Sequence, residues 1–399
     1  MSDHDKGMLP MSRRTLLRAG AYSALTLAGG RLVARAAAPV TRLAYVSTYT
    51  PAGPGITLWR VDAATGVMEQ IEAWQASNPS WIAIDQQQRH LYAVNEDEPA
   101  GGVSAYSIEP RTGRLTQISA VSSGGSAPCH LSIHPSGRYL LVANYLSGTV
   151  AVLPIDADGA LGSLVDLQGN PGAPGPARAR TSPPGQLAPS DHAGPHMHMV
   201  QSDPSGRYVF ADDAGRDQIV RWELDADTGR LATPLAVAAH AEPGSAPRHF
   251  QFSADGRMLY NLQEQDGRVC TYRYDAATAQ LQLLQSVSLF APGFAGSFTG
   301  SELMISPSGR HLYAAARLHD TITTFAIGHD GLLERRGETW TGSDYPRSFA
   351  IDPGGRFLLA CNQRGDAITT LRIDARSGAL TATGHFASIG SPVCMQFLG

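Results

Sequence analysis

The sequence predicts an all-β protein, a seven-bladed β-propeller that is closed by pairing of its N- and C-terminal strands. Two observations carry this prediction. A turn-and-strand motif recurs along the chain at nearly even spacing, and a second strand-and-turn motif occurs once more often than the first. No segment has the pattern of a substantial helix, so the repeat unit is a small β-sheet.

The first motif is a turn of the form Pro-Ser-Gly-Arg followed by an apolar strand, clearest at residues 134–142. Six copies occur, and the one near Asp85 is degraded. The steps between the arginines of successive copies are 49, 69, 50, 53 and 46 residues, as expected for propeller blades. The marker arginines are Arg89, Arg138, Arg207, Arg257, Arg310 and Arg356.

The second motif is a strand that ends in an Asp-rich turn and an apolar residue. Its seven copies begin at Trp59, Tyr106, Leu153, Trp222, Tyr272, Phe325 and Leu371. Seven copies of one half of the unit against six of the other indicate that both chain ends build the first blade. We expect residues 392–398 to pair beside residues 43–46, because a closed ring leaves no sheet edge unpaired.

The 69-residue step contains a segment rich in Gly, Pro and Ala, residues 163–190. We expect it to form a long inserted loop between blades three and four. It is either a lid or a tolerated insertion.

Residues 1–38 are predicted to be a twin-arginine signal peptide, and residues 39–399 the propeller domain. Ser12–Arg18 carries the paired arginines, and Ala34–Ala36 fits a cleavage site between small residues. The apolar run between them is too short to span a bilayer, so we expect no membrane span and a periplasmic or secreted protein. A disordered basic tail is the alternative.

The composition is that of a soluble globular protein, with 43% hydrophobic residues, 17% charged residues and a net charge of −4. It gives no sign of nucleic-acid binding. The four cysteines are too scattered for a structural zinc site, although export would permit disulfides. The only lysine, Lys6, lies in the leader, so the mature chain cannot form a Schiff base and must bind anions through arginine or backbone amides. We expect no cofactor, and a monomer is favoured.

Alignment of the repeats locates unusual residues. Nine positions before each marker arginine, at the start of the innermost strand, stand Ser80, Cys129, His198, Arg248, Ser301 and Arg347. Seven positions after it, at the end of the next strand, stand Glu96, Tyr145, Ala214, Glu264, Arg317 and Gln363. Because neighbouring strands are antiparallel, both sets should surround one mouth of the central channel.

One imidazole, one carboxylate and three guanidinium groups would therefore meet at this mouth. They are His198, Glu264, Arg248, Arg317 and Arg347. Burying them together is costly unless they pair with each other or bind a ligand. We favour an anion-binding catalytic site over a network of ion pairs that only holds the blades together.

Other polar residues carry weaker expectations. His196 and His198 share one face of a strand, which makes a copper or zinc site conceivable, but no third ligand is evident. His130 and His249 lie one position further along the strand and should face the opposite side as hydrogen-bonded core histidines; Glu302 shares their register and is ambiguous. The repeated aspartates, best explained as turn formers rather than calcium ligands, are Asp62, Asp156, Asp225, Asp275 and Asp374.

Four short motifs, Pro195–His198, Ala246–His249 followed by Glu264, Ala316–Arg317 and Ser391–Cys394, resemble the seven-bladed propeller lactonases. This family contains propeller-type 6-phosphogluconolactonases and the fungal carboxymuconate cycloisomerase. The resemblance covers nearly everything after the leader. It implies that His198, Glu264, Arg248 and Arg317 are the catalytic and substrate-binding groups. We add Arg347, His196 and Glu302 as candidate substrate-binding residues.

We therefore expect hydrolysis of a sugar-derived lactone that carries an anionic group, without a metal. His198 or Glu264 would be the general base, and a histidine near its ordinary pKa suits that role. Arg248 and Arg317 would bind the phosphate or carboxylate, and one of them could stabilise the oxyanion. Two main alternatives remain, a carboxymuconate-type cycloisomerase and a non-enzymatic cell-envelope propeller, the latter because residues 142–150 also resemble YVTN-type repeats. A calcium-dependent gluconolactonase is a third.

Overall fold

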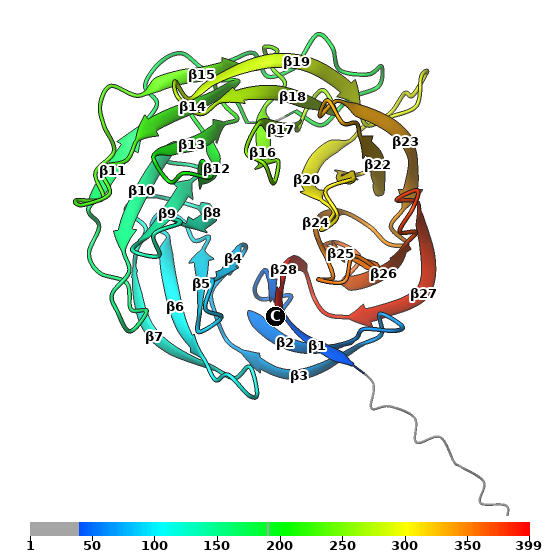
Figure 1. The fold of residues 1–399 in the computed structure, drawn as a ribbon, viewed down its shortest axis with the longest axis horizontal. Helices are drawn as coiled ribbons and strands as arrows, with labels where there is room; N and C mark the ends of the chain where they lie inside the picture. The colour runs from blue at the N-terminus through cyan, green and yellow to red at the C-terminus, as the bar shows by residue number, and fades with distance from the viewer. Residues whose placement is uncertain (1–39, 190) are drawn as a thin grey trace, which may run out of the picture. The chain divides into compact units, whose positions relative to one another are not determined.

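The computed structural model describes residues 40–189 and 191–399, which form seven four-stranded antiparallel sheets arranged around a central channel (Figure 1). The predicted signal peptide lies outside the described residues. Within them, no helix is long and apolar enough to cross a membrane.

Each blade is named here by its strands from the channel outward. Blade one contains β28 (Pro392–Leu398), β1 (Thr41–Thr48), β2 (Ile56–Asp62) and β3 (Met68–Trp74). Blade two contains β4 (Ile82–Ile84), β5 (His90–Asn95), β6 (Gly102–Ile108) and β7 (Leu115–Ser122). Blade three contains β8 (Pro128–Ile133), β9 (Tyr139–Asn144), β10 (Thr149–Pro154) and β11 (Asp166–Gly169).

The remaining blades follow the same order. Blade four contains β12 (Met197–Ser202), β13 (Tyr208–Asp213), β14 (Gln218–Glu223) and β15 (Ala236–His240). Blade five contains β16 (Pro247–Phe252), β17 (Met258–Gln263), β18 (Arg268–Asp275) and β19 (Gln280–Ser288). Blade six contains β20 (Thr299–Ile305), β21 (His311–Arg317), β22 (Thr321–Ile327) and β23 (Leu333–Trp340), and blade seven β24 (Pro346–Ile351), β25 (Phe357–Asn362), β26 (Ala367–Ile373) and β27 (Leu380–Ser388).

The predicted closure of the ring is confirmed. The C-terminal strand β28 is the innermost strand of blade one and pairs antiparallel with β1, with Leu43 opposite Leu398 and Val46 opposite Met395. Figure 1 shows the red end of the chain beside its blue beginning. Because each chain end contributes to the same sheet, the ring has no free edge at the place where it closes.

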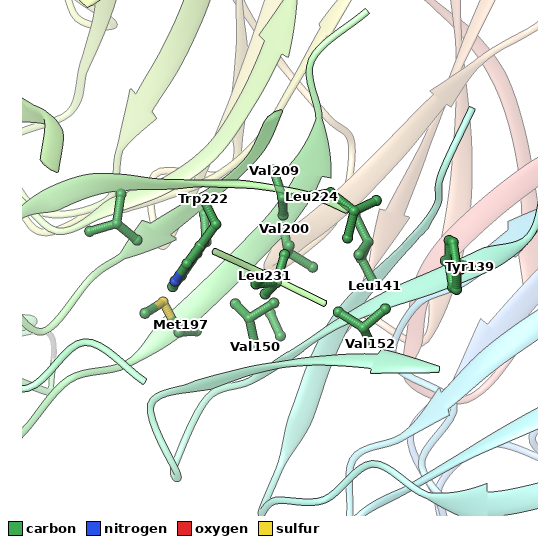
Figure 2. Packing of buried hydrophobic residues seen from close by; sticks show 13 residues of the cluster. Tyr139, Leu141, Val150, Val152, Met197, Val200, Val209, Trp222, Leu224 and Leu231 are labelled. Atoms are coloured by element: carbon green, nitrogen blue, oxygen red, sulfur yellow. The ribbon is translucent and has the colours of Figure 1, made fainter. Parts of the chain in front are cut away.

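The hydrophobic core lies between successive blades, where the faces of neighbouring sheets meet. Between blades three and four, Leu141 and Val152 pack with Val200, Val209 and Trp222, all of them buried (Figure 2). Replacing a leucine buried in this way by alanine costs about 2–5 kcal/mol of stability. These alternating apolar strands hold the blades, and so the ends of the inner strands, in fixed positions.

The turn aspartates act mainly as predicted. The Asp62 carboxylate accepts hydrogen bonds from the backbone N–H groups of Ala64 and Thr65, and Asp225, Asp275 and Asp374 cap equivalent turns. Blade three differs, because Asp158 rather than Asp156 accepts the backbone hydrogen bond there.

The predicted insertion 163–190 is shorter than expected, because its residues 166–169 form β11, the outer strand of blade three. The rest is attached to the blades that follow. The Asn170 amide donates to Asp213, the Ser182 hydroxyl donates to the carbonyl of Gln265, and the buried Gln186 amide donates to the carbonyl of Phe298. The loop therefore runs from blade three towards blade six, on the face of the ring where second strands turn into third strands.

Candidate active site

Irregular pairing at the start of the inner strands places the candidate residues. In blades three, four, five and seven, the residue nine positions before the marker arginine is the extra residue of a β-bulge. These residues are Cys129, His198, Arg248 and Arg347. A bulge redirects side chains and is common beside active sites. In blade six, the two residues Ser301 and Glu302 stand opposite the single residue Ala315.

Glu264 lies between two arginines of neighbouring blades. The Arg317 Nη2 group donates to Glu264 Oε1 at 2.7 Å, and Arg248 Nε lies 3.7 Å from Glu264 Oε2. Arg317 also donates to the carbonyl oxygen of Gly300. Both guanidinium groups are buried, whereas the carboxylate is partly exposed. The predicted meeting of these three residues at one mouth is thus what the structure shows.

His198 lies among the same arginines. It is 7% exposed, and its Nδ1 atom has no hydrogen-bond partner in the described part of the chain. Burial, followed by the positive charge of Arg248, holds the pKa of His198 well below its ordinary value. The expectation of a histidine near its ordinary pKa is therefore wrong, because burial removes the water that would solvate a charged imidazole and the arginines disfavour a further cation. The imidazole is neutral across the whole neutral pH range.

Arg347 has its own partners. Its Nη2 group donates to the hydroxyl of Tyr49 at 2.6 Å, and that hydroxyl donates to Glu96 at 2.7 Å. The carboxylate of Glu96 is 3.9 Å from Arg347. Burial lowers the pKa of Arg347, but Tyr49 and Glu96 outweigh it and raise the pKa overall. Arg347 is thus closer to a paired structural cation than to a free anion-binding group.

His196 packs against Tyr145, and the Tyr145 ring also contacts His198. Its ring stacks on Tyr145 with centroids 4.5 Å apart, and its Nδ1 atom bonds the carbonyl oxygen of the same tyrosine. His198 meets Tyr145 edge-on at 5.5 Å. No group of three or more His, Cys, Asp or Glu residues in the described ranges is arranged to hold a metal ion. The four cysteines are buried and unpaired.

Simple alternation predicts that His130 and His249 face away from the channel, but they do not. The bulge before each of them inserts one residue, so both neighbouring side chains turn inward. The rings of His249 and His198 are 5.2 Å apart, and those of His249 and His130 are 5.6 Å apart. His249 Nδ1 bonds Glu302 Oε1 at 3.0 Å, so the expected hydrogen-bonded histidine is present, but in the channel.

Glu302 lies on the side of these histidines that faces away from Arg248, Glu264 and Arg317. A cavity of about 780 Å³ reaches it from the opposite mouth of the channel and is lined by Trp81, His130, His249 and Glu302 but not by His198, Glu264 or the three arginines. The turns that carry the marker arginines Arg89 and Arg138 also line this cavity. Burial raises the pKa of Glu302 to about 8. This cavity and the charged groups thus occupy different sides of the same channel.

Two aromatic residues were not predicted from the sequence at the charged mouth, which is the channel mouth that holds His198, Arg248, Glu264 and Arg317. Tyr49 follows the first strand and bridges Arg347 to Glu96. Tyr345 precedes Arg347 by two positions, and the guanidinium carbons of Arg317 and Arg364 lie 5.3 and 3.8 Å from its ring centroid. The alignment could have found Tyr345, because it stands at a fixed offset from the marker arginine where the other blades have smaller residues.

A propeller that gathers buried arginines, a carboxylate and a neutral imidazole at one channel mouth has the groups needed to bind an anionic molecule and to move a proton. The chain belongs to the family described as "Lactonase, 7-bladed beta-propeller", which it matches over residues 43–397.

Named relatives and solved structures agree with this membership. A 6-phosphogluconolactonase of Bacillus subtilis is 30% identical, with 89% of this chain and 98% of the relative aligned. The periplasmic gluconolactonase of Pseudomonas aeruginosa superposes with a TM-score of 0.81 at 33% identity, covering 90% of this chain and 99% of that one. A putative 6-phosphogluconolactonase of Bacteroides fragilis has a TM-score of 0.80 at 29% identity, covering 90% and 98%.

These findings confirm the prediction of a lactone-hydrolysing enzyme for a sugar-derived lactone. They do not favour a cycloisomerase or a non-enzymatic propeller.

Proposed function

We propose that this protein hydrolyses a sugar lactone that carries an anionic group, at the mouth formed by His198, Arg248, Glu264 and Arg317. The observation that carries the proposal is the pairing of one partly exposed carboxylate with two buried guanidiniums beside an unpaired imidazole nitrogen. Arginines cannot lose their charge in this environment, so the mouth attracts an anion.

In the proposed reaction, water attacks the lactone carbonyl while His198 accepts its proton. Between the two candidate bases we choose His198, because both oxygens of Glu264 face guanidinium groups whereas His198 Nδ1 is free. Arg248 or Arg317 stabilises the oxyanion of the tetrahedral intermediate. The ring C–O bond then breaks, the ring oxygen takes up the proton, and a hydroxy acid is released. A base and an oxyanion donor, each contributing about 10²-fold or more, suffice for this reactive ester.

The test is to incubate the mature protein with glucono-δ-lactone, 6-phosphogluconolactone and carboxymuconate. Turnover is measured by proton release and by NMR. We expect hydrolysis of the first two and no lactonisation of the third. If neither sugar lactone is hydrolysed faster than its spontaneous rate, the proposal is refuted.

We also propose export by the twin-arginine route. The paired residues Arg13 and Arg14 and the periplasmic location in the name of the Pseudomonas aeruginosa relative support it. Replacing both arginines by lysine should leave the protein in the cytoplasmic fraction, while the parent is found outside the inner membrane. Equal distribution of the two proteins would contradict this route.

A further inference from the structure

Tyr345 forms an aromatic platform between two guanidinium groups at the edge of the charged mouth. Arg317 approaches its ring from blade six, and Arg364 lies against it from the turn between β25 and β26, at 3.8 Å from the centroid. Stacking on an aromatic face holds a guanidinium in place without using its N–H donors. Both cations therefore lie close to one ring with a defined position.

The platform itself is firmly held. The Tyr345 N–H donates to the Asp320 carboxylate at 2.9 Å, and the Tyr345 carbonyl accepts from the N–H of Gln363 at 2.9 Å. Its φ of +66° lies in the left-handed region, which is unfavourable for a bulky side chain. Equivalent positions of other blades, Asn78, Ala127 and Ala246, share this backbone conformation with smaller side chains. Blade four has the smaller ring of His196 at this offset, but its φ is not positive, so Tyr345 is the one phenol ring that the repeat places here.

Arg364 differs from the other arginines of the mouth in its partners. Arg248 and Arg317 share the Glu264 carboxylate, and Arg347 is paired with Tyr49 and Glu96. Among the described residues, Arg364 has no carboxylate partner, and its one recorded contact is the Tyr345 ring. Its side chain is exposed, so its N–H donors face solvent rather than the core. It is the guanidinium best able to accept a new anion without breaking an existing pair.

We propose that Arg364, held on Tyr345, is a phosphate-binding subsite that selects a phosphorylated sugar lactone over its uncharged parent. This inference rests on the proposed function of the neighbouring mouth. With the lactone ring beside Arg317 and Glu264, the terminal phosphate points towards the rim, where Arg364 offers a fork of donors that matches phosphate oxygens. The buried arginines then stabilise the reacting carbonyl, and Arg364 determines which substrate is held there.

The experiment compares 6-phosphogluconolactone with glucono-δ-lactone in the parent protein and in Arg364→Gln. Charge-assisted hydrogen bonds to phosphate predict a loss of about 10- to 100-fold in kcat/KM for the phosphorylated lactone, mostly through KM. The unphosphorylated lactone should change less than about 2-fold, because it has no group for Arg364 to bind. Arg372→Gln is the matched control, since Arg372 is an exposed arginine stacked on Phe357 in the same blade at 4.8 Å.

An equal loss for both lactones, or no loss for either, would overturn the subsite. If the parent hydrolyses neither lactone, the proposed function has failed instead, and the subsite is tested by calorimetric binding of 6-phosphogluconate. The parent should then bind this ligand about 10-fold or more tightly than Arg364→Gln does. Equal affinities would exclude Arg364 even in that case.

Discussion

Both sides of the channel contain buried ionisable groups, but the two sides differ in charge. At one mouth, the buried guanidinium groups of Arg248 and Arg317 form ion pairs with the carboxylate of Glu264. On the other side, the cavity reaches His249 and Glu302, which are both buried. Burial lowers the pKa of the histidine and raises that of the carboxyl, so both are neutral at pH 7.

Residue type therefore determines which buried groups stay charged in this channel. Histidine and glutamate can give up charge when water is removed, and they do so around Trp81. Arginine cannot: the pKa of Arg248 falls only to about 10, so it keeps its proton and needs a counter-charge. Ligands of opposite character suit the two sides, an anion at the charged mouth and an uncharged polar molecule in the cavity.

The largest effect is expected from Glu264→Gln, which removes the carboxylate shared by two buried guanidiniums. Loss of one partner of a buried pair costs about 3–5 kcal/mol of stability. We expect kcat/KM for the lactone to fall by about 100-fold or more, because both arginines lose their fixed positions. Steady-state kinetics and thermal unfolding measure the two effects.

The matched control for this change is Glu223→Gln, which breaks an exposed pair with Arg207. It should cost at most about 1 kcal/mol and leave turnover unchanged. If Glu264→Gln behaves like this surface variant, the charged mouth is not the site of reaction.

Stability towards acid is the next largest expectation. Burial lowers the pKa of His130, His198 and His249. Below about pH 6.5 these histidines therefore bind protons in the unfolded chain but not in the folded chain. The stability that the folded protein owes to these neutral imidazoles is fully present above about pH 6.5 and is lost as the pH falls below it. Each group adds a slope of up to about 1.4 kcal/mol per pH unit.

Urea unfolding at intervals from pH 7.5 to pH 5 measures this slope. In His130→Gln, one of the three contributions is absent, so the acid loss should be shallower. A stability that stays constant down to pH 5 would show that these imidazoles take up protons freely in the folded state.

The sequence allowed prediction of the propeller, its closure and the charged mouth because these follow from counting repeats. The six marker arginines fix the register of six of the seven inner strands, and that register brought Arg248, Glu264 and Arg317 together correctly. The same counting failed for His249, because strict alternation ignores a bulge. A bulge is a change in backbone pairing, and although a proline directly precedes the bulged residue in blades three, five and seven, a rule of strict alternation does not use that signal.

The protonation states of the site residues could not be predicted from the sequence either. The imidazole of His198 was expected near its ordinary pKa, but its environment depends on how many arginines of other blades lie around it. Long-range pairs such as Tyr49 with Arg347, at opposite ends of the chain, likewise require the closed ring. Such contacts set the electrostatics of the site, and repeat patterns do not encode them.

The activity profile against pH gives a sharper test of the charged mouth. Because His198 stays neutral well below its ordinary pKa, kcat/KM should change by less than about 2-fold between pH 7.5 and pH 6. An ordinary histidine base would lose most of its activity over that range. An acid limb centred near pH 6.5 that persists in His130→Gln would contradict a neutral His198.

The smallest effect on turnover is expected from Glu302→Gln, which copies the protonated form of the buried acid. Burial raises the pKa of Glu302 to about 8, so the folded parent keeps a proton that the unfolded chain loses above about pH 4.5. The parent's stability from this one group is therefore fully present at low pH and is lost as the pH rises through about 8, with a slope of up to about 1.4 kcal/mol per pH unit. The variant lacks this slope, so its free energy of unfolding in urea should rise relative to that of the parent between pH 6 and pH 8.5. Its kcat/KM at pH 6 should stay within a few-fold of the parent value, because the amide can still bond His249. A parallel pH dependence in both proteins would mean that Glu302 is ionised, and the neutral side of the channel would then carry charge after all.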